Sequence, residues 1–186
     1  MKGKAQAIMD GKRVLVSDLQ KANGFKSHYQ KASKLKIAKE DRWVRRELNQ
    51  NLRQATAEPE ICKAFTLSEL QAALRTSSPH KAAGPDDLHP RFLHLLGPLG
   101  VGILLKMFNA SWKLTKIPQQ WRQADIRPVP KAGKDPGDFS SFRPISLTSS
   151  VGKLMERLIT NRLRFYLEEN HLLASQQAGF RSRRST

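Results

Sequence analysis

Apolar residues recur every three or four positions along most of this chain, which is the spacing of amphipathic helices. Within residues 1–60, one stripe consists of Leu19, Ala22, Phe25 and Tyr29, and a second consists of Trp43, Val44, Leu48 and Leu52. Ser17 or Asp18 can cap the first helix. Because short amphipathic helices are marginal alone, residues 1–60 are predicted to form a basic helical arm or linker that is stabilised by docking.

Residues 61–186 carry stronger helical patterns. Thr66 and Glu69 have the spacing of a capping box, ahead of an apolar face that consists of Leu67, Leu70 and Leu74. A second helix ends before Pro118 and has an apolar face of Val101, Leu104, Leu105, Phe108 and Trp112. A long helix capped by Ser149 or Ser150 follows, and its buried face is predicted to consist of Met155, Leu158, Ile159, Leu163 and Tyr166. Its other positions include Lys153, Arg157, Arg162 and Arg164.

One stretch departs from the helical pattern. In "ADIRPVP" (residues 124–130), apolar residues lie in an extended segment, and the two prolines confine that segment to the edge of a sheet. Residues 133–137 turn the chain, and "FRPISL" (residues 142–147) returns as a second strand. The fold class is therefore predicted to be α+β and mostly helical, with one small antiparallel hairpin.

The charge balance points to a polyanionic partner. The chain has 33 Lys and Arg against 16 Asp and Glu, a net charge of +17, which favours nucleic-acid binding over small-molecule chemistry. Cys62 is the single cysteine, which excludes an internal disulfide and a cysteine-type zinc site and fits an intracellular setting. The apolar run 96–108 contains Lys106 and is too short for a bilayer. No secretory signal is visible, whereas a weak organelle-targeting signal in the basic start stays open.

The adjacent carboxylates Asp86 and Asp87 raise the question of a metal site. Two-metal catalysis needs carboxylates from separate elements that converge on ions about 3.5–4 Å apart, whereas adjacent side chains at a helix entry diverge. A helix N-terminus also stabilises negative charge. The pair is therefore interpreted as a helix cap, with Pro90 in the first turn. No metal ligand and no catalytic residue is predicted in this chain.

The predicted hairpin brings cations together. With residues 132–141 as its loop, Lys131 falls near the rung of Phe142 and diagonally close to Arg143, and Lys134 adds a third cation. Like charges this close destabilise a sheet unless an anion lies between them, and a lysine beside an arginine fork suits a polyphosphate. A solvated edge that blocks aggregation is the equally open alternative.

Four stretches occur in an order that resembles the reverse transcriptases of non-LTR (LINE-type) retrotransposons, most of all the trypanosomatid ingi-like group. They are "SPHKAAGPDDLHPRFL", "IPQQWRQADIRPVPKAGKDP", "SSFRPISLTSSVGKLMERLITNRL" and "LLASQQAGFRSRRST". The resemblance implies a right-hand polymerase with an RNA template, nucleoside triphosphates and Mg²⁺. It assigns residues 61–186 to an N-terminal extension and the fingers, and residues 1–60 to a linker from the endonuclease.

The resemblance also implies roles for single residues. Arg143 would contact the incoming triphosphate, assisted by Lys131 or Lys134. The cations predicted to bind RNA are Lys81, Arg91, Arg127, Arg157, Arg162 and Arg181. Arg143→Lys is expected to impair nucleotide use more than RNA binding in an enzyme with a restored palm, whereas Arg162→Lys, on the outer face of the long helix, is expected to do little.

The sequence departs from the family where the palm would begin. No aspartate follows Asp138, so the palm and its Mg²⁺ ligands are expected to be absent, and no primer extension is expected from the chain alone. The leading interpretation is the N-terminal part of a reverse transcriptase. The alternatives are a non-catalytic RNA-binding subunit of a ribonucleoprotein, bound to a structural RNA, and a plain helical interaction module. A nuclear or ribonucleoprotein-associated location, without a membrane, is expected.

Overall fold

The computed structural model describes residues 7–10, 13–34, 41–54, 59–174, 176–179 and 181, and it divides the chain into two compact units. The first unit combines residues 1–55 with residues 125–147. The second unit combines residues 56–124 with residues 148–186. The sequence-based division at residue 60 lies near the first break, but the hairpin groups with the N-terminal arm rather than with the helices that flank it in sequence.

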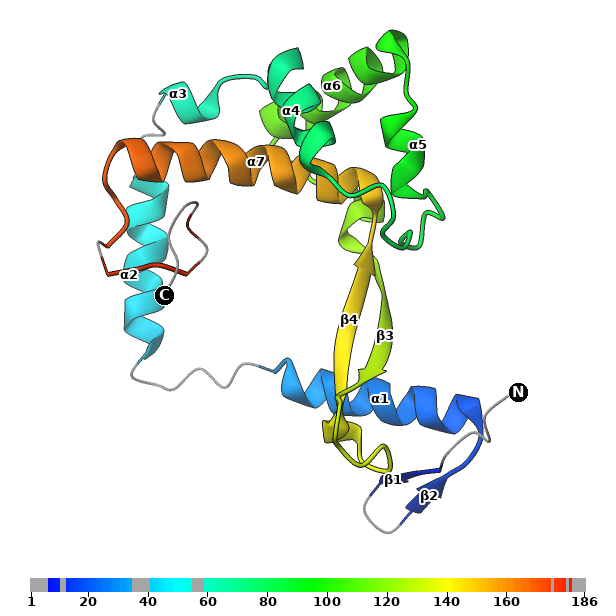
Figure 1. Cartoon of the computed structure of the whole chain (residues 1–186). Coiled ribbons are helices and arrows are strands. Elements are labelled where there is room, and N and C mark those ends of the chain that lie inside the picture. The colour runs from blue at the N-terminus through cyan, green and yellow to red at the C-terminus, as the bar shows by residue number, and fades with distance from the viewer. Residues whose placement is uncertain are drawn as a thin grey trace. The chain divides into compact units, whose positions relative to one another are not determined.

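The described part of the first unit consists of two small two-stranded sheets and two helices (Figure 1). Its elements are β1 (Ile8–Asp10), β2 (Arg13–Leu15), α1 (Asp18–Ala32), α2 (Asp41–Gln54), β3 (Ala124–Pro130), the 3₁₀ turn η2 (Phe139–Ser141) and β4 (Phe142–Thr148). β1 pairs with β2, and β3 pairs with β4. Every strand is thus an edge strand, which is why the prolines of β3 are tolerated. The predicted hairpin is confirmed.

An aromatic cluster explains why the hairpin groups with the arm. The ring of Phe25 on α1 lies 4.8 Å from that of Phe139 and 4.9 Å from that of Phe142, in both cases edge to face. Ile8 is buried in the same cluster, and the amide of Met9 donates to the carbonyl of residue 137 at 2.8 Å. The hairpin loop therefore completes the core of the first unit.

The two predicted arm helices have different environments. α1 begins at the N-cap Ser17, which forms a capping box with Gln20, and it buries Phe25. α2 is a helix as predicted, but Trp43, Val44 and Leu48 on it are exposed. The side chain of Leu52 lies outside the described residues. The predicted helix is confirmed, whereas the predicted docking of its apolar stripe stays a prediction.

The second unit is helical. Its elements are α3 (Pro59–Cys62), α4 (Leu67–Thr76), α5 (Pro90–His94), α6 (Pro98–Lys113), the 3₁₀ turn η1 (Gln119–Arg122) and α7 (Ser150–Glu169). α4, α5 and α6 gather along α7 (Figure 1), and Leu70, Phe108 and Leu158 lie fully buried at the centre of their shared core. The Thr66–Glu69 capping box is confirmed at the start of α4.

Two predicted core residues are exposed instead. Leu67 on α4 and Leu163 on α7 are 48% and 44% exposed. Ala73 and Leu154 are buried in the core although the helical pattern did not single them out. The buried stripe of each helix is thus displaced from the predicted one, because the packed neighbours choose which side of an amphipathic helix faces inward.

Candidate nucleic-acid interface

The two adjacent aspartates lie in a turn and do not cap a helix. Asp86 accepts a hydrogen bond from the amide two residues later at 3.2 Å. The amide of Asp87 donates to the carbonyl of Gly84 at 3.1 Å, and Asp87 itself has a left-handed φ of 51°. The N-cap of α5 is His89, with Pro90 in the first turn as predicted. The predicted aspartate cap is therefore wrong, because the carboxylate of Asp86 accepts its hydrogen bond within the turn that precedes α5.

Gly84 holds this loop against the start of α7. A Cβ on Gly84 would lie 2.4 Å from the carbonyl carbon of Thr148 and 2.7 Å from the amide nitrogen of Ser149. Only glycine permits an approach of two backbones as close as this. The loop of residues 81–87 is thereby seated at the junction of β4 and α7, which brings Lys81 to the side of α7.

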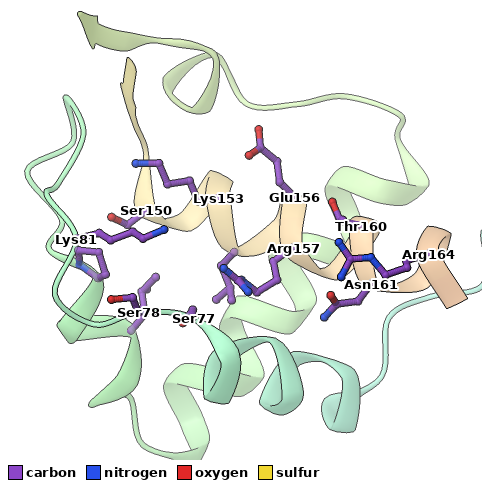
Figure 2. Close-up of a pocket in the computed structure, with 13 residues that line it drawn as sticks. Ser77, Ser78, Lys81, Ser150, Lys153, Glu156, Arg157, Thr160, Asn161 and Arg164 are labelled. Carbon is purple, nitrogen blue, oxygen red and sulfur yellow. The ribbon is translucent and has the colours of Figure 1, made fainter. Parts of the chain in front are cut away.

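A groove of about 390 Å³ runs along α7 beside this loop (Figure 2). We call it the α7 groove. Pro90, Leu93 and Leu154 are its apolar lining residues. Its polar lining consists of the cations Lys81, Lys153, Arg157 and Arg164, the carboxylate Glu156, and the neutral groups Ser77, Ser78, Ser150, Thr160 and Asn161. Four positive charges therefore face a single negative one among the described lining residues.

The α7 groove follows one face of the helix. Ser150, Lys153, Arg157, Thr160 and Arg164 recur at three- and four-residue intervals, so they repeat along a single side with a rise of about 5.4 Å per turn. From first to last they cover roughly 21 Å. Figure 2 shows Glu156 extending away from Ser77 and Ser78. This line of cations and hydrogen-bond donors suits an extended polyanion better than one small ligand.

The start of α7 is capped as predicted. The side-chain oxygen of Ser149 accepts a hydrogen bond from the amide of Gly152 at 3.2 Å. The following residue, Ser150, is 4% exposed, and its hydroxyl has no hydrogen-bond partner among the described residues. The end of the groove beside Lys81 thus contains an unsatisfied donor.

Arg162 does not lie on the outer face of α7, and that part of the prediction is wrong. Its guanidinium binds the carboxylate of Glu69 through two nitrogens, at 3.0 Å and 2.8 Å, and its side chain is 12% exposed. It lies over the ring of Phe65 at 4.4 Å. It also donates to the carbonyls of Ile61, Lys63 and Ala64. Arg162 therefore ties the start of α4 and the segment before it to α7, and its predicted contact with RNA stays a prediction.

The carboxyl of Glu69 is adapted to this arginine. Partial burial would raise the pKa of Glu69, but hydrogen bonds from the backbone of Thr66 and from Arg162 outweigh it and hold the pKa below its usual value. The ionised form is therefore favoured in the folded state. The carboxylate of Glu69 therefore serves both the capping box with Thr66 and the ion pair with Arg162.

Arg181 is also engaged within the fold. Its guanidinium binds Glu168, with Nε at 2.9 Å from the carboxylate, and donates to the carbonyl of Ala174 at 3.1 Å. Its side chain is 10% exposed, and the hydrogen bond to Glu168 raises the pKa of Arg181. Its predicted contact with RNA stays a prediction.

The other predicted RNA-binding residues lie in different places. Lys81 and Arg157 are brought together in the α7 groove. Arg91 is exposed on α5 and is not among the lining residues of that groove. Arg127 is exposed on β3, where it borders a separate and mainly apolar groove of about 1250 Å³ against α1. Burial raises the pKa of Tyr29 in that second groove.

The three hairpin cations are not equivalent. Lys134 and Arg143 are exposed, but the ammonium of Lys131 donates to the carbonyl of Ser140 at 2.8 Å. The amide and hydroxyl of Ser140 lower the pKa of Asp138, with a smaller contribution from the charge of Lys131. Lys131 thus already has partners in its own loop, and its predicted phosphate contact stays a prediction.

The site predicted from the sequence left out most polar residues of the groove, among them Lys153, Arg164 and Ser150. Lys153 and Arg164 were grouped with the general basic surface of the long helix, and Ser150 was considered only as a cap. Their common signal is helical spacing with Arg157, which would have placed all four on one face. That spacing does not by itself show that the face is open rather than packed.

No group of three or more His, Cys, Asp or Glu that could hold a metal ion is found within the described ranges. The expectation that Mg²⁺ enters only with a palm stays a prediction. Within the same ranges, no helix is long and apolar enough to cross a membrane.

Comparison with known proteins identifies relatives for about two thirds of the chain. It is 37% identical over 123 residues to the RNA-directed DNA polymerase from mobile element jockey of Drosophila melanogaster. This match covers 66% of this chain and 13% of the relative. It is 36% identical over 124 residues, 67% of this chain and 14% of the relative, to the probable RNA-directed DNA polymerase from transposon BS of the same fly. It is 32% identical over 118 residues to the probable RNA-directed DNA polymerase from transposon X-element, also of Drosophila melanogaster. That match covers 63% of this chain and 13% of the relative.

Over these matched residues the chain is homologous to non-LTR retrotransposon reverse transcriptases. It spans about 13% of the length of the curated relatives that it matches. No family model matches it. The relationship confirms the resemblance predicted from the four sequence stretches, whereas the closer likeness to the ingi-like group stays a prediction.

Proposed function

We propose that this chain forms the fingers part of a retrotransposon RNA-directed DNA polymerase and holds the RNA template along the α7 groove. The supporting observation is the row of cations, Lys81, Lys153, Arg157 and Arg164, beside hydroxyl and amide side chains. The relatives are named as RNA-directed DNA polymerases, and such an activity requires a surface for RNA.

The groove side chains match the chemistry of a ribose–phosphate backbone. Lysine ammonium groups neutralise phosphates as point charges, and arginine forks bind them through two nitrogens. Serine, threonine and asparagine side chains donate to phosphate oxygens or bond the 2′-hydroxyl that distinguishes RNA. None of these contacts reads a base, so the groove is expected to bind single strands with little sequence preference.

Salt dependence tests the proposal. Binding of the chain to a fluorescent single-stranded oligoribonucleotide is measured by anisotropy over a series of salt concentrations. The logarithm of affinity is expected to fall linearly with the logarithm of salt, by about 0.7 per phosphate contacted. Lys153→Gln with Arg157→Gln should weaken binding and reduce the slope by about 1.4, which corresponds to two lost contacts.

A charge-matched control separates the groove from the net charge. Lys106→Gln with Lys113→Gln removes two exposed cations from α6, outside the groove. This pair should change the affinity much less than the groove pair. Equal losses from both pairs would mean that the chain attracts RNA through diffuse charge, and the groove assignment would be wrong.

The proposal has a nucleotide-binding part as well. Arg143 and Lys134 are exposed on the hairpin and free of the contact that engages Lys131, so they are the better candidates for the triphosphate. Polymerisation is not proposed for the chain alone, and a primer-extension assay with template, nucleotides and Mg²⁺ is expected to give no template-dependent product.

A further inference from the structure

The first turn of α7 has backbone donors that suit an anion. α7 is 20 residues long, and the first amides of a helix lack intrahelical acceptors and attract negative charge. The side chain of Ser149 satisfies only the amide of Gly152. The amides of Ser150 and Val151 occupy the two positions before it.

The hydroxyl of Ser150 is a second and independent feature. Ser150 borders the α7 groove, its residue is 4% exposed, and its hydroxyl has no partner among the described residues. A buried donor without an acceptor lowers stability. A phosphate oxygen at this end of the groove would accept from the hydroxyl and remove that penalty.

Two lysines supply the charge. Lys153 lies one turn after Ser150 on α7, and Lys81 comes from the loop that Gly84 seats on the β4–α7 junction. Figure 2 shows Lys81 and Ser78 at the end of the groove occupied by Ser150, with Arg164 at the other end. The hydroxyl itself is buried, so a phosphate oxygen reaches it only when side chains at this end of the groove move.

We propose that the start of α7 is a phosphate site that anchors one backbone phosphate of the RNA strand. The hydroxyl of Ser150 and the first-turn amides donate to the phosphate oxygens, and Lys81 and Lys153 neutralise its charge. The remaining groove cations then follow the strand away from this anchor. The assignment to RNA rests on the proposed function, whereas the affinity for phosphate does not.

Inorganic phosphate tests the site in the full chain. Amide resonances of Ser150 and Val151 are followed by NMR while phosphate replaces chloride at constant ionic strength. They should shift in a saturable manner, and Ser150→Ala should bind phosphate about tenfold more weakly. Ser27→Ala, an exposed serine on α1, should bind as the unchanged chain does. The absence of a shift, or an equal shift in Ser150→Ala, would overturn the site.

Stability without phosphate distinguishes a binding role from a structural one. Because the hydroxyl of Ser150 has no partner, Ser150→Ala should leave the melting temperature in chloride unchanged or raise it. A clear decrease would mean that the hydroxyl has a structural hydrogen bond, and the proposal would be wrong.

RNA binding separates this inference from the proposed function. Ser150→Ala should weaken binding of the oligoribonucleotide about tenfold, since a hydrogen bond to a charged group is lost. If this variant binds RNA normally while Lys153→Gln with Arg157→Gln does not, the proposed function stands and the anchor is refuted. If phosphate shifts the amides but RNA does not bind, the proposed function fails and the assignment of the site to RNA is wrong.

Discussion

Arginines close together on one helix have opposite roles in this protein. Arg157 and Arg164 line the α7 groove, whereas Arg162 is bound by Glu69 and by three carbonyls. All three belong to the same basic stretch of sequence. Their roles differ because Arg157 and Arg164 lie on the side of α7 that borders the groove, whereas Arg162 lies on the side that faces the segment before α4.

The contacts of Arg162 predict a stability effect. Arg162→Lys keeps the charge but loses the planar fork that binds Glu69 and the carbonyls together. It is expected to destabilise the chain by about 1–3 kcal/mol, measured by urea unfolding. Arg164→Lys, two residues later and exposed, is the control and should change stability little. An Arg162→Lys variant as stable as the control would show that the network contributes nothing.

At the scale of elements, the loop of residues 81–87 and the start of α7 form one structural feature. Their backbones touch at Gly84, although more than sixty residues of sequence lie between them. Asp86 stabilises the turn of the loop through a hydrogen bond, and Gly84 allows the loop to lie against the start of α7. This loop therefore contributes to the candidate site by positioning Lys81.

Two glycine substitutions test that arrangement. Gly84→Ala places a Cβ 2.4 Å from the backbone of Thr148, so the loop must move. It should cost about 1–3 kcal/mol and weaken RNA binding by displacing Lys81. Gly102→Ala in α6 meets nothing within 4 Å and should stabilise the chain by about 0.4–1 kcal/mol. Both are measured by thermal unfolding, and a Gly84→Ala variant with unchanged stability would refute the close approach.

At the scale of the whole molecule, the hairpin of β3 and β4 belongs to the N-terminal unit although the helices of the other unit flank it in sequence. The rings of Phe25, Phe139 and Phe142 join it to α1. The hairpin that carries Arg143 is therefore supported by a helix of the arm, and a two-stranded hairpin is marginally stable without such packing.

Loss of Phe25 should therefore affect the hairpin loop selectively. Phe25→Ala is expected to destabilise the first unit by about 3–5 kcal/mol, so trypsin should cleave after Lys131 and Lys134 much faster than in the unchanged chain. The helices of the second unit should remain resistant, as mass spectrometry of the fragments would show. Phe165→Ala, 67% exposed on α7, is the control. An unchanged cleavage pattern in the hairpin loop would contradict the packing argument.

Local chemistry in the sequence was sufficient to predict much of the local structure. Helical spacing predicted α1, α4, α6 and α7, and proline-limited strands predicted the hairpin. Capping preferences predicted Thr66 as an N-cap and left Ser17 or Asp18 and Ser149 or Ser150 as alternatives, of which the structure has Ser17 and Ser149. These features depend on hydrogen bonds and side-chain periods within a few residues, which the sequence states directly. The order of four longer stretches also predicted the family that the relatives confirm.

Tertiary structure alone decided which of the charged residues are free. In the sequence, Arg162 and Arg181 look like the other basic residues. In the structure they bind Glu69 and Glu168, which lie 93 and 13 residues away along the chain. The joining of Lys81 to the face of Lys153 and Arg157 likewise depends on a backbone contact at Gly84. An amphipathic pattern states that a helix has two sides, whereas only packing against distant segments determines which polar side chains stay open to a ligand.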